Sequence, residues 1–238
     1  MEFFIDSADI EAIRELCGFL PIDGVTTNPT IITKSGKEPE QVFAELAEVL
    51  TEDQKIIAQV VSLDYEGILA EAGKIASVRG GKNIVVKIPV TREGLRAIPA
   101  VKARGISVLA TGIYSPDQAF WAAKAGADYL APYVNRMCSY GDGVGQVVEL
   151  VNTLAQYGFE AKVCAASFKN VDQVHQLLAA GVPAITVNPD TIRDMVGHPG
   201  TAIAMEEFCA NWEKAYGRTT LVTGGGDRGT GVLSHSRS

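Results

Sequence analysis

A lysine stands inside an apolar, β-branched segment of this sequence. Residues 83–90 read Asn-Ile-Val-Val-Lys-Ile-Pro-Val, which places Lys87 in the middle of the run. Runs of this kind are typical of strands buried on both faces of a parallel sheet. An unpaired ammonium group is costly there, and burial favours the neutral amine, which is a nucleophile toward carbonyl carbon. The alternative is an edge strand from which Lys87 reaches water.

Polar side chains stand at the ends of seven successive predicted strands. In chain order they are Asp6, then Thr26 with Thr27 and Asn28, Gln59, Lys87, Thr111, Tyr133 with Arg136, and Ser167. Each also has a structural explanation of its own: a helix cap, a tight turn before proline, a hydrogen-bonded core residue, aromatic packing or a solvated loop. Their recurrence at strand ends favours a shared site around the lysine.

The titratable members of this set suit Schiff-base chemistry. A neutral Lys87 can attack a ketone, and the resulting protonated imine accepts electrons while a carbon–carbon bond breaks, as in a retro-aldol reaction. Asp6 and Tyr133 are the candidate acid/base groups, Tyr133 acting through a water molecule. Gln59 and Thr111 are candidates to orient that water. The reaction needs no metal and no cofactor.

The remaining members suit substrate binding. Thr26 and Asn28 are candidates to hold sugar hydroxyls. Arg136 and Ser167, together with backbone N–H groups at a helix start, are candidates to hold a phosphate. The glycine-bearing run 141–145 lacks the Gly-Lys-Ser or Gly-Lys-Thr ending of a phosphate-binding loop, so we interpret it as a turn or helix start.

Strand-like and helical segments alternate along the chain that positions these residues. The predicted strands cover 3–6, 24–27, 55–61, 84–88, 106–113, 127–133, 161–166 and 184–187. This alternation indicates a parallel α/β sheet, and eight units in about 200 residues fit a (β/α)8 barrel, that is, a TIM barrel. A doubly wound open sheet is the alternative, but Ser7-Ala8-Asp9 replaces its glycine-rich fingerprint.

The remaining chain predicts one domain with a tail. We expect a single barrel domain over residues 1–220, including an additional C-terminal helix over 201–216. Residues 221–238 are rich in glycine and serine, and this composition predicts a disordered or artificially added tail.

Composition limits the classes of function. The 238 residues include 28 acidic and 21 basic ones, a net charge of −7, which disfavours a nucleic-acid partner. We find neither a signal peptide nor an apolar run long enough for a membrane span, and therefore expect no membrane partner. The four cysteines are widely spaced and form no zinc or disulfide pattern. These features predict a cytoplasmic protein with a small-molecule substrate.

Five segments resemble the transaldolase/fructose-6-phosphate aldolase family over about residues 1–218. They are Phe-Ile-Asp6-Ser-Ala-Asp, Gly24-Val-Thr-Thr-Asn28-Pro-Thr-Ile-Ile, Val-Val-Lys87-Ile-Pro-Val-Thr, Ala131-Pro-Tyr133-Val-Asn-Arg136 and Ala165-Ala-Ser167-Phe-Lys. The resemblance implies a class I aldolase of carbohydrate metabolism on a (β/α)8 barrel, with Lys87 as the Schiff-base lysine. It also implies homo-oligomers, commonly decamers of two pentamers, in which the last helix packs on a neighbouring subunit.

Three positions resemble the aldolase branch of that family. Gln59, Thr111 and Tyr133 stand where transaldolases generally carry Glu, Asn and Phe. The resemblance therefore implies cleavage of fructose 6-phosphate, or a similar anionic ketose, to dihydroxyacetone and glyceraldehyde 3-phosphate. The alternatives are a transaldolase, including one that acts on sulfosugars and one in the pentose phosphate pathway, and a non-catalytic sugar-phosphate-binding barrel.

Overall fold

A computed structural model describes residues 1–222 of the chain. These residues fall into two compact units, Met1–Met195 and a second that begins at Val196. The predicted single domain over residues 1–220 stays a prediction. The predicted tail lies outside the described residues except for its first two positions, 221 and 222.

The first unit is a closed barrel of eight parallel strands in sequential order. The strands are β1 (Glu2–Asp6), β2 (Gly24–Thr26), β3 (Lys55–Gln59), β4 (Ile84–Pro89), β5 (Ser107–Ile113), β6 (Tyr129–Pro132), β7 (Lys162–Ala165) and β8 (Ala184–Val187). The pairing of β1 with β8 closes the sheet. The predicted (β/α)8 barrel is therefore confirmed, and the alternative of an open, doubly wound sheet is wrong.

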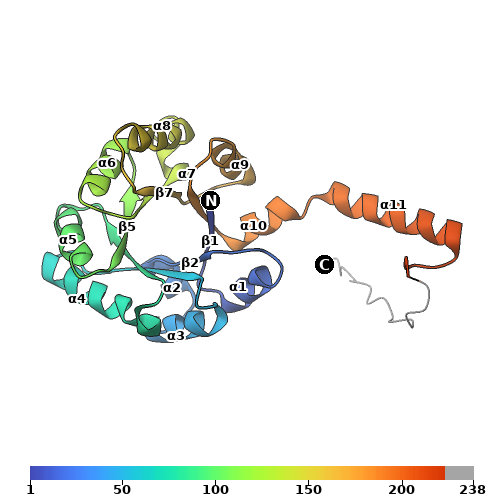
Figure 1. The fold of residues 1–238 in the computed structure, drawn as a ribbon, viewed down its shortest axis with the longest axis horizontal. Helices are drawn as coiled ribbons and strands as arrows, with labels where there is room; N and C mark the ends of the chain where they lie inside the picture. The colour runs from blue at the N-terminus through green and yellow to red at the C-terminus, as the bar shows by residue number, and fades with distance from the viewer. Residues whose placement is uncertain (223–238) are drawn as a thin grey trace. The chain divides into compact units, whose positions relative to one another are not determined.

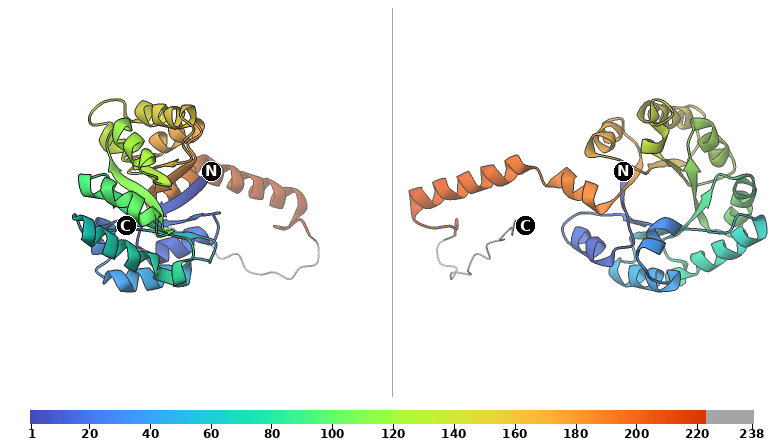
Figure 2. Two further views of the ribbon diagram at one scale, coloured as in Figure 1. Left: turned by 60° about the vertical axis from the view of Figure 1, so that its left-hand side comes forward. Right: turned by 180° about the vertical axis from the view of Figure 1, so that it is seen from behind.

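Helices surround the strands of this unit (Figure 1), and the view from behind shows the same outer ring (Figure 2). They are α1 (Ile10–Cys17), α2 (Pro29–Lys34), α3 (Pro39–Val49), α4 (Tyr65–Ala76), the 3₁₀ turn η1 (Val78–Gly81), α5 (Arg92–Lys102), α6 (Pro116–Lys124), α7 (Val134–Met137), α8 (Gly143–Gln156), α9 (Val171–Ala179) and α10 (Pro189–Val196). The second unit contains α11 (Pro199–Tyr216). None of the helices among residues 1–222 is both long and apolar enough to cross a bilayer.

Side-chain caps fix where many of these helices begin. Ser115 accepts a hydrogen bond from the Gln118 amide, and Pro116 follows it as the first residue of α6, as the sequence predicts. Asp142 caps α8 by accepting from the Gly145 amide. The glycine-bearing run before α8 therefore serves a helix start, which confirms our interpretation of it.

Two apolar layers hold the barrel. One lies between the strands and the helices, and a smaller one fills the barrel interior: Phe4, Ile57, Val85, Leu109, Tyr129, Ala131, Cys164, Ala166 and Ala184. The neighbouring strand β3 leaves no room for a side chain at Gly24, where an added Cβ would lie 2.2 Å from the Lys55 carbonyl oxygen. That position therefore requires glycine.

A carboxylate closes the barrel at the amino-terminal ends of the strands. The Glu2 carboxylate accepts from Lys55 Nζ at 2.7 Å, from the Tyr129 hydroxyl at 2.9 Å and from Lys162 Nζ at 3.3 Å. Burial disfavours the charged form of Glu2, but the hydrogen bonds from Lys55, Tyr129 and Lys162 outweigh it and lower its pKa. Burial and the neighbouring Glu2 carboxylate raise the pKa of the Tyr129 phenol. Each donor therefore stabilises the ionised carboxylate.

We predict that this cluster makes stability depend on pH. Because the pKa of Glu2 is lower in the folded state, its contribution is present above the unfolded-state value of 4.5 and is lost as pH falls through the folded-state value. Glu2→Gln should lower the free energy of unfolding by about 1–2 kcal/mol at pH 7, and this difference should shrink toward pH 3.

Urea unfolding from pH 7 to pH 3 measures this difference. The control is Glu52→Gln, which removes an exposed partner of Lys82 and should change stability by less than about 0.5 kcal/mol. An equal loss for Glu2→Gln at both ends of the pH range would contradict the prediction.

Candidate active site

Most of the predicted site residues lie two positions after a residue that faces the barrel interior on the same strand. Since successive side chains of a strand point to opposite faces, a residue two positions after an inward-facing one also points inward. Because all strands are parallel, these positions meet at the carboxyl-terminal mouth of the barrel. The predicted ones are Asp6 after Phe4, Gln59 after Ile57, Lys87 after Val85, Thr111 after Leu109 and Tyr133 after Ala131. The same spacing adds Thr186 after Ala184, which was not predicted.

Lys87 is buried in this ring. Only 2% of the residue is exposed, and its amine donates one hydrogen bond, to the Thr27 carbonyl oxygen at 3.4 Å. Within residues 1–222 no carboxylate lies within ion-pair distance of it. Lys87 therefore does not reach water from an edge strand, and its nitrogen is available to a molecule in the barrel mouth.

Gln59 lies on the strand next to Lys87. The two Cα atoms are register partners of β3 and β4, so both side chains point to the same face of the sheet. The Gln59 Oε1 atom is buried and has no hydrogen-bond partner among the described residues. A buried amide oxygen without a partner is costly, which favours a water molecule or a substrate hydroxyl beside it.

A chain of hydroxyl groups holds Asp6. The Thr26 hydroxyl donates to Asp6 Oδ1 at 2.7 Å, and it lies 2.6 Å from the Thr186 hydroxyl. Because Thr26 has one hydrogen and gives it to Asp6, Thr186 must be the donor in the second bond. Asp6 does not cap α1, since Asp9 accepts from the first amides of that helix.

Thr186 is a site residue that the sequence analysis missed. Thr186 lies in a short strand of apolar and β-branched residues, where a threonine is common as an ordinary core residue. The spacing of two from Ala184, applied to the eighth strand, would have found it.

A β-bulge positions Thr111 and Tyr133. The pairing of β5 with β6 shifts register between Ala110 and Ile113, and Gly112 supplies the positive φ of 71° within it. The Thr111 hydroxyl lies 3.1 Å from the Tyr133 hydroxyl. Both residues therefore present their hydroxyls to the same part of the mouth, as the proposed acid/base chemistry requires.

Arg136 and Ser167 lie on the rim. Arg136 Nη1 donates to the Tyr114 hydroxyl at 2.8 Å, and this hydrogen bond raises the pKa of Arg136. Ser167 has a left-handed φ of 61°, a conformation that costs energy for a residue with a side chain. Its carbonyl accepts from the Asn135 amide at 3.0 Å, which ties it to α7. Ser167 does not cap α9.

Asn28 combines two tasks. Its Oδ1 accepts from the Ile31 amide at 3.0 Å, so it is the N-cap of α2, and Pro29 follows as the first helical residue. The sequence predicted a turn or a sugar contact here and no helix. The cap occupies the carbonyl oxygen of the side chain, which leaves its amide nitrogen as the group that can donate to a ligand.

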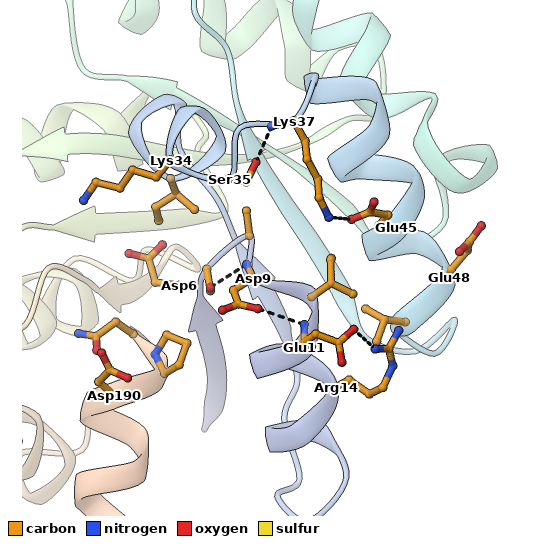
Figure 3. Close-up of a pocket in the computed structure, with 17 residues that line it drawn as sticks. Asp6, Asp9, Glu11, Arg14, Lys34, Ser35, Lys37, Glu45, Glu48 and Asp190 are labelled. Atoms are coloured by element: carbon orange, nitrogen blue, oxygen red, sulfur yellow. Dashed lines mark hydrogen bonds and ion pairs between the residues drawn. The ribbon is translucent and has the colours of Figure 1, made fainter. Parts of the chain in front are cut away.

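A pocket of about 1240 Å³ opens beside the mouth, among α1, α2, α3 and the start of α10. Figure 3 shows Asp6, Lys34 and Asp190 on one side of it, and the Lys37–Glu45 and Arg14–Glu11 ion pairs on the other. Among the predicted site residues only Asp6 lines this pocket. It is therefore a side pocket and not the place where Lys87 meets a ligand.

The interior of the barrel also contains Cys164. Burial raises the pKa of this thiol to about 12. Cys164 therefore remains a protonated, apolar packing residue. Within residues 1–222 no group of three His, Cys, Asp or Glu side chains is arranged to hold a metal ion.

Solved structures that resemble this chain share its barrel. A structure described as native KDPGal aligns with a TM-score of 0.54 and 16% identity, over 79% of this chain and 82% of that one. A flavocytochrome b2 variant with sulfite bound aligns with a TM-score of 0.58 and 11% identity, over 79% of this chain and 57% of that one. At these identities the likeness concerns the fold alone.

Comparison of sequences is more specific. The pattern of the family described as Transaldolase/Fructose-6-phosphate aldolase matches residues 3–220. A protein named "Probable transaldolase" from Caulobacter sp. (strain K31) is 39% identical over 213 residues, which cover 89% of this chain and 96% of that protein. The chain therefore belongs to the transaldolase/fructose-6-phosphate aldolase family.

Proposed function

We propose that this protein is a class I aldolase. It cleaves fructose 6-phosphate, or a similar anionic ketose, reversibly into dihydroxyacetone and glyceraldehyde 3-phosphate. The observation that carries the proposal is the buried Lys87 amine, 2% exposed and beside the unpartnered amide oxygen of Gln59. Membership of the family supports the same chemistry.

In the first half of the proposed reaction, the neutral Lys87 amine attacks the ketone carbon of the sugar. A carbinolamine forms, its hydroxyl takes a proton from the Asp6 carboxyl group and leaves as water, and a protonated imine remains. Asp6 then accepts the proton of the hydroxyl group on the departing carbon of the bond that breaks, and this oxygen becomes the aldehyde oxygen. The electron pair of that bond moves to the imine, which becomes an enamine, and the aldehyde leaves.

The second half of the reaction, the fate of the enamine, distinguishes a lyase from a transferase. A water molecule beside Gln59 and held by the Tyr133 hydroxyl protonates the enamine carbon, and Tyr133 replaces the proton. Hydrolysis of the new imine releases dihydroxyacetone and restores Lys87. The Thr111 hydroxyl, 3.1 Å from that of Tyr133, keeps the phenol directed at the water.

The alternative is a transaldolase that passes the same three-carbon unit to a second sugar phosphate. It is favoured by the name of the 39% identical relative, "Probable transaldolase". The two activities share Lys87, Asp6 and the imine. They differ in whether the enamine meets a proton or an aldehyde first.

We predict that Lys87 forms a covalent adduct. Borohydride reduction with dihydroxyacetone should add one reduced three-carbon unit to the peptide that contains Lys87, because borohydride converts an imine into a stable amine. Mass spectrometry of the digest measures it. Lys87→Met should remain folded and lose both the adduct and turnover.

The matched control is Lys34→Met, which changes an exposed lysine of the side pocket. This variant should keep the adduct at Lys87. A wild-type protein without the adduct would contradict the Schiff-base mechanism. Full turnover in Lys87→Met would do the same and would favour a metal-dependent aldolase.

We predict that free dihydroxyacetone is released from fructose 6-phosphate without an acceptor. Tyr133→Phe should slow this release by about 10²–10⁴-fold, because it removes the proton donor, and should slow transfer to erythrose 4-phosphate much less. Adding Gln59→Glu should strengthen this bias toward transfer. Coupled enzymatic assays with and without erythrose 4-phosphate measure both rates.

Tyr157→Phe is the control, since Tyr157 is exposed and packs against Phe120 on the helical side of the barrel. It should leave both rates unchanged. If the wild-type protein turns over only in the presence of erythrose 4-phosphate, the transaldolase alternative is correct.

We also propose that the protein is a homo-oligomer, and the ring-shaped decamer implied by the family resemblance is the form we expect. Helix α11 has no buried residue in the isolated chain. Met205, Phe208, Trp212 and Tyr216 share one face at helical spacing, and Phe208 is 61% exposed. An apolar helical face of this kind favours a protein partner.

We predict that charges on this face weaken the assembly. Phe208→Glu combined with Trp212→Glu should shift the mass found by light scattering toward the 25.3 kDa of one chain. Glu207→Gln, on the opposite face of α11, is the control and should keep the wild-type mass. A monomeric wild-type protein would contradict the oligomer.

A cytoplasmic location completes the proposal. The cysteines at positions 17, 138, 164 and 209 are free thiols. Free thiols agree with a reducing compartment, in which disulfides are rare.

A further inference from the structure

Tyr114 connects two residues of the candidate site and has no role in the chemistry described so far. It follows β5 directly, after the bulge at Gly112. Its hydroxyl accepts from Arg136 Nη1 at 2.8 Å. Its ring meets the Tyr133 ring edge to face, with 5.8 Å between the centroids. It therefore touches both the proposed anion-binding residue and the proposed acid/base residue.

Hydrogen-bond counting assigns a free donor to Tyr114. A guanidinium group has only donors, so the Tyr114 oxygen must be the acceptor in its bond with Arg136. The hydroxyl hydrogen of Tyr114 is then not used in that bond, and no other partner of this hydroxyl is found within residues 1–222. Tyr114 therefore presents a hydrogen-bond donor beside the cationic donors of Arg136.

Arg136 is held from two sides. Its Cζ atom lies 5.0 Å from the centroid of the Tyr133 ring, which is a cation–π contact, while Tyr114 takes one of its N–H groups. An arginine whose rotamer is fixed before binding loses less conformational entropy when an anion arrives. The remaining N–H groups stay in the planar arrangement that suits an oxyanion.

We propose that Tyr114 is a specificity-determining residue for the phosphate end of the aldehyde half of the substrate. Its oxygen orients Arg136, and its hydrogen donates to the same phosphate that Arg136 binds. Arg136 lies over the face of the Tyr133 ring, whose hydroxyl serves the proposed proton transfer. The proposal rests on the aldolase or transaldolase function proposed above.

Kinetics with two aldehydes test the role of Tyr114. In the direction of synthesis, Tyr114→Phe should lower the ratio of kcat/KM for glyceraldehyde 3-phosphate to kcat/KM for glyceraldehyde about tenfold, since it removes one charge-assisted hydrogen bond. The change should lie in KM. In an Arg136→Met background, Tyr114→Phe should change this ratio less than about twofold, because both side chains act on one phosphate.

Tyr140→Phe is the matched control. Tyr140 is 81% exposed, its ring packs on Tyr114 with 6.4 Å between the centroids, and its hydroxyl is not bonded to Arg136. It should leave the ratio at the wild-type value. An unchanged ratio in Tyr114→Phe would overturn the proposal, and so would an equal tenfold loss with and without Arg136.

Binding of glycerol 3-phosphate separates this proposal from the proposed function. This compound has the phosphate but no carbonyl group, so its binding does not require an imine. Calorimetry should show a Kd about tenfold higher for Tyr114→Phe than for the wild-type protein or Tyr140→Phe. Equal Kd values would overturn the role of Tyr114, whereas a missing dihydroxyacetone adduct on Lys87 would overturn only the enzymatic proposal.

Discussion

The hydrogen-bonding capacity of one buried amine is the constraint on which the mouth of the barrel depends. Lys87 is almost fully removed from water, and the Thr27 carbonyl uses only one of its N–H donors, at 3.4 Å. Buried polar groups normally have at least one hydrogen-bond partner, either in the protein or in an ordered water, and Gln59 Oε1 has none among the described residues. The side chains of Lys87 and Gln59 point to the same face of the sheet, so the unused N–H donors of Lys87 and the unpartnered Gln59 oxygen face the same space. A ligand or ordered water that satisfies one therefore lies within reach of the other.

The inward-facing polar side chains at the two ends of the barrel differ in whether they have hydrogen-bond partners. At the amino-terminal end the inward-facing Glu2, Lys55 and Tyr129 satisfy one another, with 2.7 Å between Lys55 Nζ and Glu2 Oε1. At the carboxyl-terminal end the inward-facing Lys87 and Gln59 do not. An apolar layer separates the two ends. Polar groups that satisfy one another contribute to stability, whereas buried polar groups without partners favour a site that a ligand completes.

The sequence predicts the barrel and most of its mouth because both depend on strict periods. Alternating strands and helices, together with polar residues at strand ends, are local patterns, and the structure confirms the eight strands. Short elements carry too few residues to show a period, so α2 and α7, of six and four residues, were not predicted. The position of Tyr114 after the β5 bulge could not be predicted, because a register shift depends on the pairing with the partner strand. The left-handed φ of Ser167 has no signature in residue type.

The contact between Thr111 and Tyr133 bears on the difference between lyase and transferase. In the proposed reaction Tyr133 gives up its proton to the water and later regains one, so its oxygen alternates between donor and acceptor. The Thr111 hydroxyl, 3.1 Å away, can reverse its own direction at each step because a hydroxyl both donates and accepts. An asparagine amide at that position would offer a fixed donor or a fixed acceptor. A threonine beside a tyrosine therefore suits repeated proton transfer to the enamine, which favours release of the three-carbon unit over its transfer.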